Sequence, residues 1–211
     1  MRGLFITLEG PDGSGKSTMI EKIGKYLEEK GIDAIITREP GGTTIGEEIR
    51  SIILDIKNVN MGAETEALLY AAARAQHVHE KIQPEIENGK VVVCDRFLLS
   101  SLAYQGVGRG LGIPEVKSIN EFGLRGMKPD LILFFHVDPE VTLLRKTSAG
   151  GDRLEVEGGA FHKGVYEGYM TLLKMYPENI VMIDAHKPID EVYTQTITAL
   201  EKVLKAKEET L

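Results

Sequence analysis

A glycine-rich segment near the N-terminus constrains the fold more than any other part of the chain. Residues 10–17 read GPDGSGKS and match the spacing G-x-x-x-x-G-K-[ST]. An apolar run over residues 4–8 precedes them, and a helical pattern begins near Ser17. A strand, a tight glycine loop and a helix N-terminus in this order direct backbone N–H groups toward a phosphate. The segment therefore predicts a phosphate-binding loop rather than a glycine-rich turn without a ligand.

The residue types in this loop suit a nucleoside triphosphate. Lys16 supplies a cation for the β- and γ-phosphates, and the Ser17 hydroxyl can ligate Mg²⁺. The predicted ATP site consists of Gly10, Pro11, Asp12, Gly13, Ser14, Gly15, Lys16, Ser17 and Thr18.

Five short apolar runs alternate with helical patterns along the chain. Near-continuous apolar runs are typical of parallel strands that helices cover on both faces. The runs lie at residues 4–8, 34–37, 91–94, 131–137 and 180–183. This alternation predicts an α/β fold, a doubly wound five-stranded parallel sheet of the P-loop NTPase type, with ligands at the carboxyl ends of the strands.

Apolar stripes and glycine or proline residues at their ends predict the helices between these runs. The first is expected from about Ser17 to Gly31, the second over 45–54 and a long third over 63–88. Others are expected to start near Pro114, Pro139 and Val156, and a last one carries a stripe from Ile189 to Leu204. Two glycine-rich segments, 105–112 and 148–155, are predicted to be a flexible loop and a mobile lid.

Length and composition favour one cytoplasmic domain. The 211 residues suffice for a single well-buried core, so we expect one domain over 1–211. Cys94 is the single cysteine, which fits a reducing compartment, and its apolar surroundings favour a small buried side chain over a reactive thiol. The net charge of -7 argues against a nucleic-acid partner. We also expect no signal peptide, because residues 1–3 run directly into the first predicted strand. No membrane partner is expected either, because no apolar stretch approaches about 20 residues.

An acid and an arginine follow the predicted strand over 91–94. Asp95 is placed to hold Mg²⁺, directly or through water. Arg96 stands where many ATP-hydrolysing proteins have a glutamate, and a cation there suits an anionic acceptor better than hydrolysis. An ordinary turn at a strand end remains the alternative. No Asn-Lys-x-Asp signature of guanine binding occurs, which counts against a GTPase.

The long third helix combines an apolar stripe with an aromatic and cationic face. Tyr70, Arg74 and His77 share one face by helical spacing, and such a ring and guanidinium can bind a planar base. An ordinary solvated face is the alternative. His79 falls on the apolar stripe and is expected to be a packing residue. The stripe consists of Leu68, Ala72, Ala75, Ile82 and Ile86.

Two further groups of charged residues are ambiguous by themselves. Residues 38–43 follow the second strand and lead into a helix that carries Arg50, so they either reach an acceptor or merely start that helix. The cations Arg145, Lys146 and Arg153 flank the predicted lid. They are either a solvated charge run or are carried by the lid onto the transferring phosphoryl group.

Together these segments resemble a thymidylate kinase of the bacterial type, over almost the whole chain. EPGGT and AYQG are specific to this family among small kinases. The matching stretches are residues 9–18 (EGPDGSGKST), 37–43 (TREPGGT), 68–74 (LLYAAAR), 95–97 (DRF), 100–106 (SSLAYQG), 129–131 (PDL) and 152–155 (DRLE). The resemblance implies a nucleoside monophosphate kinase-like domain with a lid over about 146–159.

The resemblance also implies roles for individual residues. Tyr70 matches the ring that stacks on thymine, while Arg50 and Arg96 match the arginines that hold the acceptor phosphate. The implied dTMP site is Asp12, Glu39, Arg50, Tyr70, Arg74, Arg96, Ser101, Tyr104 and Gln105. The implied catalytic residues are Lys16, Arg96, Arg145 and Arg153, and the implied metal ligands are Ser17 and Asp95.

The expected activity is the Mg²⁺-dependent transfer of the γ-phosphoryl group of ATP to dTMP, a step in dTTP synthesis, by a homodimer. The alternatives are a kinase for another nucleoside monophosphate and a non-catalytic nucleotide-binding module. Two features depart from the family: Leu99 replaces an acid that is common in bacterial relatives, and the lid contains Gly150 and Gly151. Positions 11–14 of the phosphate loop hold no arginine or lysine, so the lid is expected to supply the extra cation.

Overall fold

The structure is a computed structural model that describes residues 2–138, 140–141 and 152–209. Its five parallel strands form one sheet in the order β2-β3-β1-β4-β5. The strands are β1 (Leu4–Glu9), β2 (Ala34–Arg38), β3 (Val91–Asp95), β4 (Leu131–His136) and β5 (Ile180–Asp184). Each predicted strand is confirmed to within one residue at either end.

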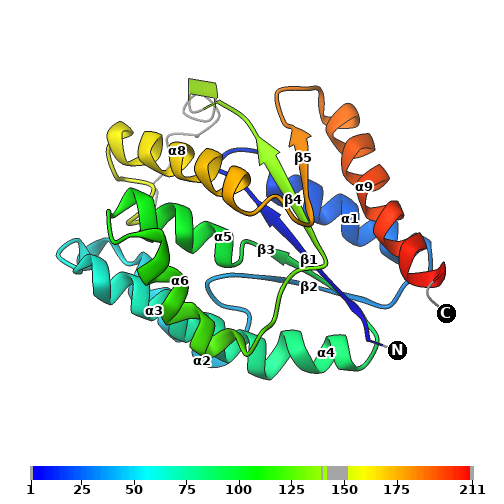
Figure 1. The fold of residues 1–211 in the computed structure, drawn as a ribbon, viewed down its shortest axis with the longest axis horizontal. Coiled ribbons are helices and arrows are strands. Elements are labelled where there is room, and N and C mark those ends of the chain that lie inside the picture. The colour runs from blue at the N-terminus through cyan, green and yellow to red at the C-terminus, as the bar shows by residue number, and fades with distance from the viewer. Residues whose placement is uncertain (1, 139, 142–151, 210–211) are drawn as a thin grey trace.

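Helices cover both faces of this sheet (Figure 1). Helices α1 and α9 lie on one face, and the remaining helices gather on the other and at its lower edge. The α-helices are α1 (Lys16–Glu29), α2 (Thr44–Leu54), α3 (Ala63–His77), α4 (Gln83–Glu87), α5 (Leu98–Ser101), α6 (Ile113–Leu124), α8 (Gly159–Met175) and α9 (Ile189–Glu209). A 3₁₀ turn, η1 (Ile56–Asn58), and two π-helical segments, η2 (Val78–Ile82) and η3 (Leu102–Gly108), complete the order.

Alternation along the central strands sends side chains into two separate cores. In β1, Leu4, Ile6 and Leu8 pack against α1 and α9, while Phe5 points into the opposite layer beside η2 and α4. This follows from the period of two in a strand. Because both faces are covered, every residue of β1 is buried, which is why the run reads as continuously apolar.

The structure corrects several of the local predictions. Residues 105–108, the first part of the segment 105–112 that was expected to be a flexible loop, belong to the π-helix η3, which packs against α8. On α3, Leu68 and Ala72 are exposed although they were placed on the apolar stripe, and His79 is exposed as well. The buried side of α3 instead holds Glu66, Arg74 and His77, because it faces the polar end of the sheet.

The apolar stripes predicted for the first and last helices are confirmed to different extents. The stripe of the first helix is confirmed, since Ile20, Ile23 and Leu27 are buried, but Ile189 of the last stripe is exposed. The helix start at Pro139 and the residues Arg145, Lys146, Gly150 and Gly151 lie outside the described residues. Among the helices that the structure describes, none combines the length and the apolar character needed to cross a membrane.

The strand order brings the predicted chemistry to one edge. Asp95 pairs in register with Leu8 of β1 and with Arg38 of β2. The chain segments that leave β1, β3 and β2 therefore emerge side by side at their carboxyl ends. These segments are the phosphate loop, the turn at Arg96 and the segment that begins with Glu39.

Candidate active site

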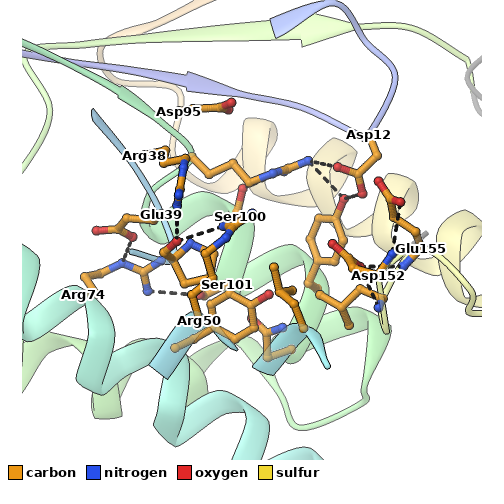
Figure 2. A pocket seen from close by; sticks show the side chains of 17 residues that line it. Asp12, Arg38, Glu39, Arg50, Arg74, Asp95, Ser100, Ser101, Asp152 and Glu155 are labelled. Atoms are coloured by element: carbon orange, nitrogen blue, oxygen red, sulfur yellow. Dashed lines mark hydrogen bonds and ion pairs between the residues drawn. The ribbon is translucent and has the colours of Figure 1, made fainter. Parts of the chain in front are cut away.

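A cavity of about 200 Å³ opens at this edge of the sheet (Figure 2). Its walls come from the phosphate loop, the ends of β2 and β3, helices α2, α3 and α5, segment η3 and residues 152–155. Arginines and carboxylates face one another across it, as the labelled side chains show. Every predicted dTMP-binding residue lines this cavity: Asp12, Glu39, Arg50, Tyr70, Arg74, Arg96, Ser101, Tyr104 and Gln105.

The phosphate loop is held close to the sheet. Gly10 has a φ of +137°, and a Cβ atom there would lie 2.6 Å from the carbonyl oxygen of Phe135 on β4, so no larger residue fits. Lys16, at the start of α1, donates from Nζ to the carbonyl oxygens of Gly10 (3.0 Å) and Pro11 (2.8 Å). The ammonium group therefore lies inside the turn of the loop.

The environment of Lys16 alters its protonation. Its side chain is buried, and burial together with the charge of Arg96 lowers the pKa of the Lys16 ammonium to about 8. A negatively charged ligand in the loop opposes this effect, because an anion favours the protonated form of a nearby amine.

Arg96 connects the phosphate loop with the cavity. Its backbone is in the left-handed region, with a φ of +67°, which is uncommon for a residue with a side chain. Nη1 donates to the carbonyl oxygen of Gly10 (2.9 Å), and Nη2 donates to the carboxylate of Asp12 (2.5 Å). The Tyr104 hydroxyl donates to the other oxygen of Asp12 (2.8 Å). A single guanidinium thus contacts the phosphate loop while it lines the cavity.

Behind Arg96 lies a buried carboxylate that the sequence did not single out. Glu9, the last residue of β1, accepts hydrogen bonds from the Phe97 N–H (2.9 Å) and the Ser100 hydroxyl (2.5 Å). Burial raises the pKa of Glu9 above its usual value. Arg96 Nη1 also donates to Ser100 (3.0 Å) and to the Tyr169 hydroxyl (3.1 Å), so these groups hold the arginine in place.

Arg74 is fully engaged in a buried network. Its Nε donates to Glu39 (2.7 Å), and its terminal nitrogens donate to Ser101 (3.0 Å), Asn120 (2.5 Å) and the carbonyl oxygen of Phe97 (2.9 Å). Arg74 is therefore not on a solvated face, which was the alternative to a base-binding role. Its plane is fixed by contacts on three sides, as Figure 2 shows for Glu39 and Ser101.

His77 extends this network away from the cavity. Nδ1 lies 3.1 Å from the Glu39 carboxylate and Nε2 lies 2.8 Å from the Thr37 hydroxyl. Gly42 packs against the same ring: it has a φ of +83°, and a Cβ atom would lie 2.6 Å from Nε2. The conformation of the EPGGT segment and the position of His77 therefore depend on each other.

Two arginines meet at the end of β2. Arg50 on α2 and Arg38 both donate to the carbonyl oxygen of Pro40, at 2.9 Å and 3.1 Å. Burial and the nearby charge of Arg38 lower the pKa of Arg50. Tyr70, one helix away, also lines the cavity and packs against the apolar cluster around Tyr104. Like charges held this close suit an anion between them.

Arg153 is not where the lid interpretation expected it. Its side chain is 3% exposed, does not line the cavity, and donates to Glu66 (2.6 Å) and to the carbonyl oxygen of Ile53 (2.7 Å). In this structure Arg153 joins the lid end to α2 and α3 and makes no contact with the phosphate loop. An arginine in a glycine-rich segment suggests a mobile cation when the sequence alone is considered. The sequence does not indicate its buried partner, because Glu66 lies 87 residues away.

The predicted metal ligands fit Mg²⁺ in character. Oδ1 of Asp95 is buried and has no hydrogen-bond partner among the described residues, and Ser17 is exposed at the start of α1. In the described part of the chain no three His, Cys, Asp or Glu residues gather as a metal cluster. Mg²⁺ in kinases takes one or two protein oxygens together with water and phosphate oxygens, so a pair of such residues is sufficient.

Sequence reasoning missed several residues of this site. Arg96 donates to Ser100 and Tyr169, Arg153 donates to Glu66, and Glu9 accepts a hydrogen bond from Ser100. Glu9 and Ser100 lie within stretches that resemble the family, whereas Glu66 and Tyr169 carry no local signal beyond their residue type. Of the seven cavity-lining residues that had not been assigned to the site, four are polar or charged: Arg38, Ser100, Asp152 and Glu155. Two of the four, Asp152 and Glu155, flank Arg153 in the DRLE stretch, so that motif already marked their position.

Comparison with known proteins decides the family. The family profile described as thymidylate kinase matches residues 8–196, most of the chain. The chain belongs to the thymidylate kinase family.

Individual members agree with this assignment. The thymidylate kinase of Finegoldia magna is 57% identical over 200 residues, which cover 94% of this chain and 98% of that protein. The thymidylate kinase of a Geobacillus species is 52% identical over 203 residues, covering 95% and 97% of the two chains. The crystal structure of thymidylate kinase from Ehrlichia chaffeensis superimposes with a TM-score of 0.78 at 30% identity, covering 95% and 99%.

The activity follows from this membership. A thymidylate kinase transfers the γ-phosphoryl group of ATP to dTMP, giving ADP and dTDP on the path to dTTP. The family assignment therefore excludes both alternatives to this activity: a kinase whose main acceptor is a different nucleoside monophosphate, and a non-catalytic nucleotide-binding module.

Proposed function

We propose that Arg96 aligns the acceptor phosphate of dTMP with the phosphate loop. The observation that carries this proposal is its position: one nitrogen contacts the loop at Gly10, while the side chain lines the acceptor cavity. Arg50, across the cavity, supplies a second cation for the same phosphate. Two guanidiniums bind the dianion and bring its oxygen in line with the γ-phosphate that Lys16 holds. No strong base is required, because a phosphate monoester is already largely deprotonated near neutral pH.

The base and the sugar of dTMP occupy the rest of the cavity in this proposal. Tyr70 offers a ring face for the thymine, with Arg74, Ser101 and Gln105 along its edge. Tyr104, bonded to Asp12, lies where its ring can disfavour a 2′-hydroxyl. Glu39 holds Arg74 rather than the sugar directly, since both of its oxygens are used by Arg74 and His77.

We propose Ser17 and Asp95 as the protein ligands of Mg²⁺. The support is the pair of features given above, an unpartnered buried carboxylate oxygen and an exposed hydroxyl at the loop. When bound, the ion neutralises charge on the β- and γ-phosphates. The nine residues from Gly10 to Thr18 remain the proposed ATP site.

The role of Arg153 is revised in this proposal. Because it is paired with Glu66 and held by Ile53, we assign it to anchoring the lid end instead of clamping the donor phosphates. Arg145 remains the proposed lid cation. The chain is proposed to act as a single domain over 1–211, with a lid over about 146–159.

A homodimer and a cytoplasmic location complete the proposal. Helices α2, α3 and α6 lie together in Figure 1 and present Ile52, Leu68 and Phe122 to solvent, with Phe122 93% exposed. Large apolar groups gathered on one helical face are typical of a surface that another chain covers. The cytoplasmic location rests on the single cysteine.

The experiment that tests the acceptor assignment measures ADP release over a panel of nucleoside monophosphates. dTMP is expected to give the highest kcat/KM. Arg96→Lys keeps the charge but loses the paired nitrogens, and we expect its kcat/KM for dTMP to fall roughly 100-fold. An Arg96→Lys enzyme with unchanged kcat/KM would remove Arg96 from the acceptor phosphate.

A further inference from the structure

Glu66 is a buried carboxylate at the centre of three elements. It lies in the first turn of α3 and its side chain is fully buried. Gln105 of η3 donates to it from Nε2 (2.9 Å), Arg109 donates from Nη2 (3.0 Å), and Arg153 donates from Nη2 (2.6 Å). Buried carboxylates without such partners are rare, because the charge loses its hydration.

The two arginines keep Glu66 ionised. Burial raises the pKa of Glu66, but the hydrogen bonds from Arg109, Gln105 and Arg153 outweigh this effect, and the pKa lies below its usual value. An ionised carboxylate only accepts hydrogen bonds. Whatever side-chain group faces Glu66 must therefore be a donor.

This requirement orients the amide of Gln105. A glutamine amide has one donor end and one acceptor end, and its NH₂ group must face Glu66. The carbonyl oxygen Oε1 is left for the other side, and Gln105 lines the cavity. No described group donates to Oε1, since the hydrogen bond that Gln105 makes through its side chain is the one to Glu66. The end of the amide that remains for a ligand is therefore an acceptor.

We propose that Glu66 is a positioning residue for base recognition, which acts by fixing the Gln105 carbonyl oxygen as an acceptor for the ring N–H of a pyrimidine. This rests on the proposed assignment of Gln105 to the base site. Thymine carries a hydrogen on N3, whereas N3 of cytosine is an acceptor and meets the Gln105 oxygen unfavourably. A site that leaves a buried polar group unpaired discriminates strongly against the wrong ligand.

The lid end takes part in this arrangement. Arg153 is one of the two cations that keep Glu66 ionised, and its backbone N–H also bonds to the carbonyl oxygen of Leu54 (3.2 Å). Arg109 pairs with Glu157 (2.6 Å) and stacks on Phe161, with 4.5 Å from the guanidinium carbon to the ring centre. Arg153 therefore contributes to base recognition through Glu66 and not through contact with the base.

The decisive variant is Glu66→Gln, in which residue 66 can both donate and accept, so the Gln105 amide is free to turn. We expect the KM for dTMP to rise about tenfold while kcat changes less than about threefold, because the lost interaction is present in both ground and transition states. The ratio of kcat/KM for dTMP over dCMP should fall by a similar factor. Unchanged KM and unchanged selectivity would overturn the proposal.

A double-mutant cycle separates positioning from general structural support. Gln105→Ala should itself raise the KM for dTMP, and in that background Glu66→Gln should add less than about twofold. Fully additive effects would show that Glu66 does not act through Gln105 and would overturn the inference. If Gln105→Ala leaves the KM unchanged, the assignment of Gln105 to the base site is itself wrong, which is a different failure.

Two further measurements guard against effects of stability. Glu157→Gln removes the second partner of Arg109 but leaves Glu66 in place, and we expect its dTMP over dCMP ratio to match that of the unmodified enzyme. A loss of selectivity as large as that of Glu66→Gln would contradict a specific role for Glu66.

The last measurement needs no change at Glu66 and covers the case in which Glu66→Gln does not fold. The Gln105 side-chain amide can be assigned in nitrogen-15 spectra by its disappearance in Gln105→Ala. Its protons should exchange slowly with water both with and without dTMP, because Glu66 holds them. Protons that become protected only when dTMP binds would place the NH₂ group toward the base and overturn the proposal.

Discussion

At the scale of single residues, burial decides how the charged groups of the site behave. Cys94 is an example of a structural residue: it is fully buried, its thiol lies 3.1 Å from the carbonyl oxygen of Arg96, and burial raises the pKa of the thiol. It is a packing residue, as the apolar run around it indicated. For Lys16, burial lowers the pKa of the ammonium to about 8, close to the pH at which many enzymes work.

The lowered pKa of Lys16 predicts that ATP binding takes up a proton near pH 8. In the free protein the ammonium loses its proton around pH 8, and the phosphates of ATP raise this pKa again. Affinity for ATP should therefore fall by up to about tenfold as the pH rises from 7 to 9, as expected for a group that must be protonated in the complex. Calorimetric titration in two buffers with different ionisation enthalpies measures both the affinity and the proton uptake.

The matched control is Lys16→Arg, whose guanidinium stays charged over this range. Whatever its absolute affinity for ATP, Lys16→Arg should bind ATP equally well at pH 7 and at pH 9. A persistent dependence of ATP affinity on pH would assign the proton to another group.

The effect of Lys16 on folding has the opposite trend with pH, because the unfolded chain holds the Lys16 proton up to about pH 10.5. The contribution of Lys16 to the free energy of unfolding therefore increases as the pH rises from about 8 to that value.

At the scale of elements, contacts between helices and the lid end decide what each charged side chain does. The DRLE stretch is not a solvated segment, because Arg153 is buried against α2 and α3 and Leu154 is buried in the apolar cluster around Tyr104, while Asp152 and Glu155 line the cavity. The backbone N–H groups of Leu154 and Glu155 both bond to Asp152, which holds the turn in shape. Residues 152–155 thus form a turn that Asp152 holds in shape.

Replacement of Arg153 tests this interpretation of the lid end. Arg153→Ala leaves the buried Glu66 with one arginine fewer, and we expect the free energy of unfolding to fall by about 3 kcal/mol, as for a broken buried ion pair. Chemical denaturation measures this loss, and kcat should fall less than about tenfold. Arg153→Lys keeps the charge but not both hydrogen bonds, so its free energy of unfolding should lie between those of the unmodified chain and of Arg153→Ala. A 100-fold loss of kcat at unchanged stability would instead support direct contact with the donor phosphates.

At the scale of the whole molecule, the sheet order and the packing of α2, α3 and α6 determine two surfaces. One is the edge where the carboxyl ends of β1, β2 and β3 meet and form the cavity. The other is the apolar face around Phe122, on the outside of the same helices. Helix α3 carries both Arg74, which is buried and lines the cavity, and Leu68, which is exposed, so one helix contributes to the cavity and to the proposed dimer surface.

The proposed dimer gives a prediction at this scale. Phe122→Glu places a charge in the centre of the apolar face, and we expect sedimentation to show a monomer where the unmodified chain is a dimer. Met182→Glu, on the exposed part of β5, adds the same charge elsewhere and should remain dimeric. A monomeric unmodified chain, or a Phe122→Glu variant that stays dimeric, would contradict the proposal for this surface.

Much of the fold was predictable because its signals are local. The phosphate-loop spacing and the five apolar runs predicted the parallel sheet, since a buried strand shows its burial in its own residues. Residues 105–108 were mistaken for part of a flexible loop because the glycines there allow close packing: a Cβ on Gly108 would lie 2.8 Å from Val165 of α8. Glycine in a sequence does not distinguish flexibility from close approach.

The sequence by itself determined the class of fold, the phosphate loop and most of the residues that line the cavity. Only the tertiary structure decided how those residues are paired. Glu66 and Arg153, or Glu39 and His77, are far apart in the chain, and nothing near them indicates which carboxylate meets which cation. Burial removes water from these charges, so each must find a partner inside the protein, and the choice of that partner depends on distances that only the folded chain sets.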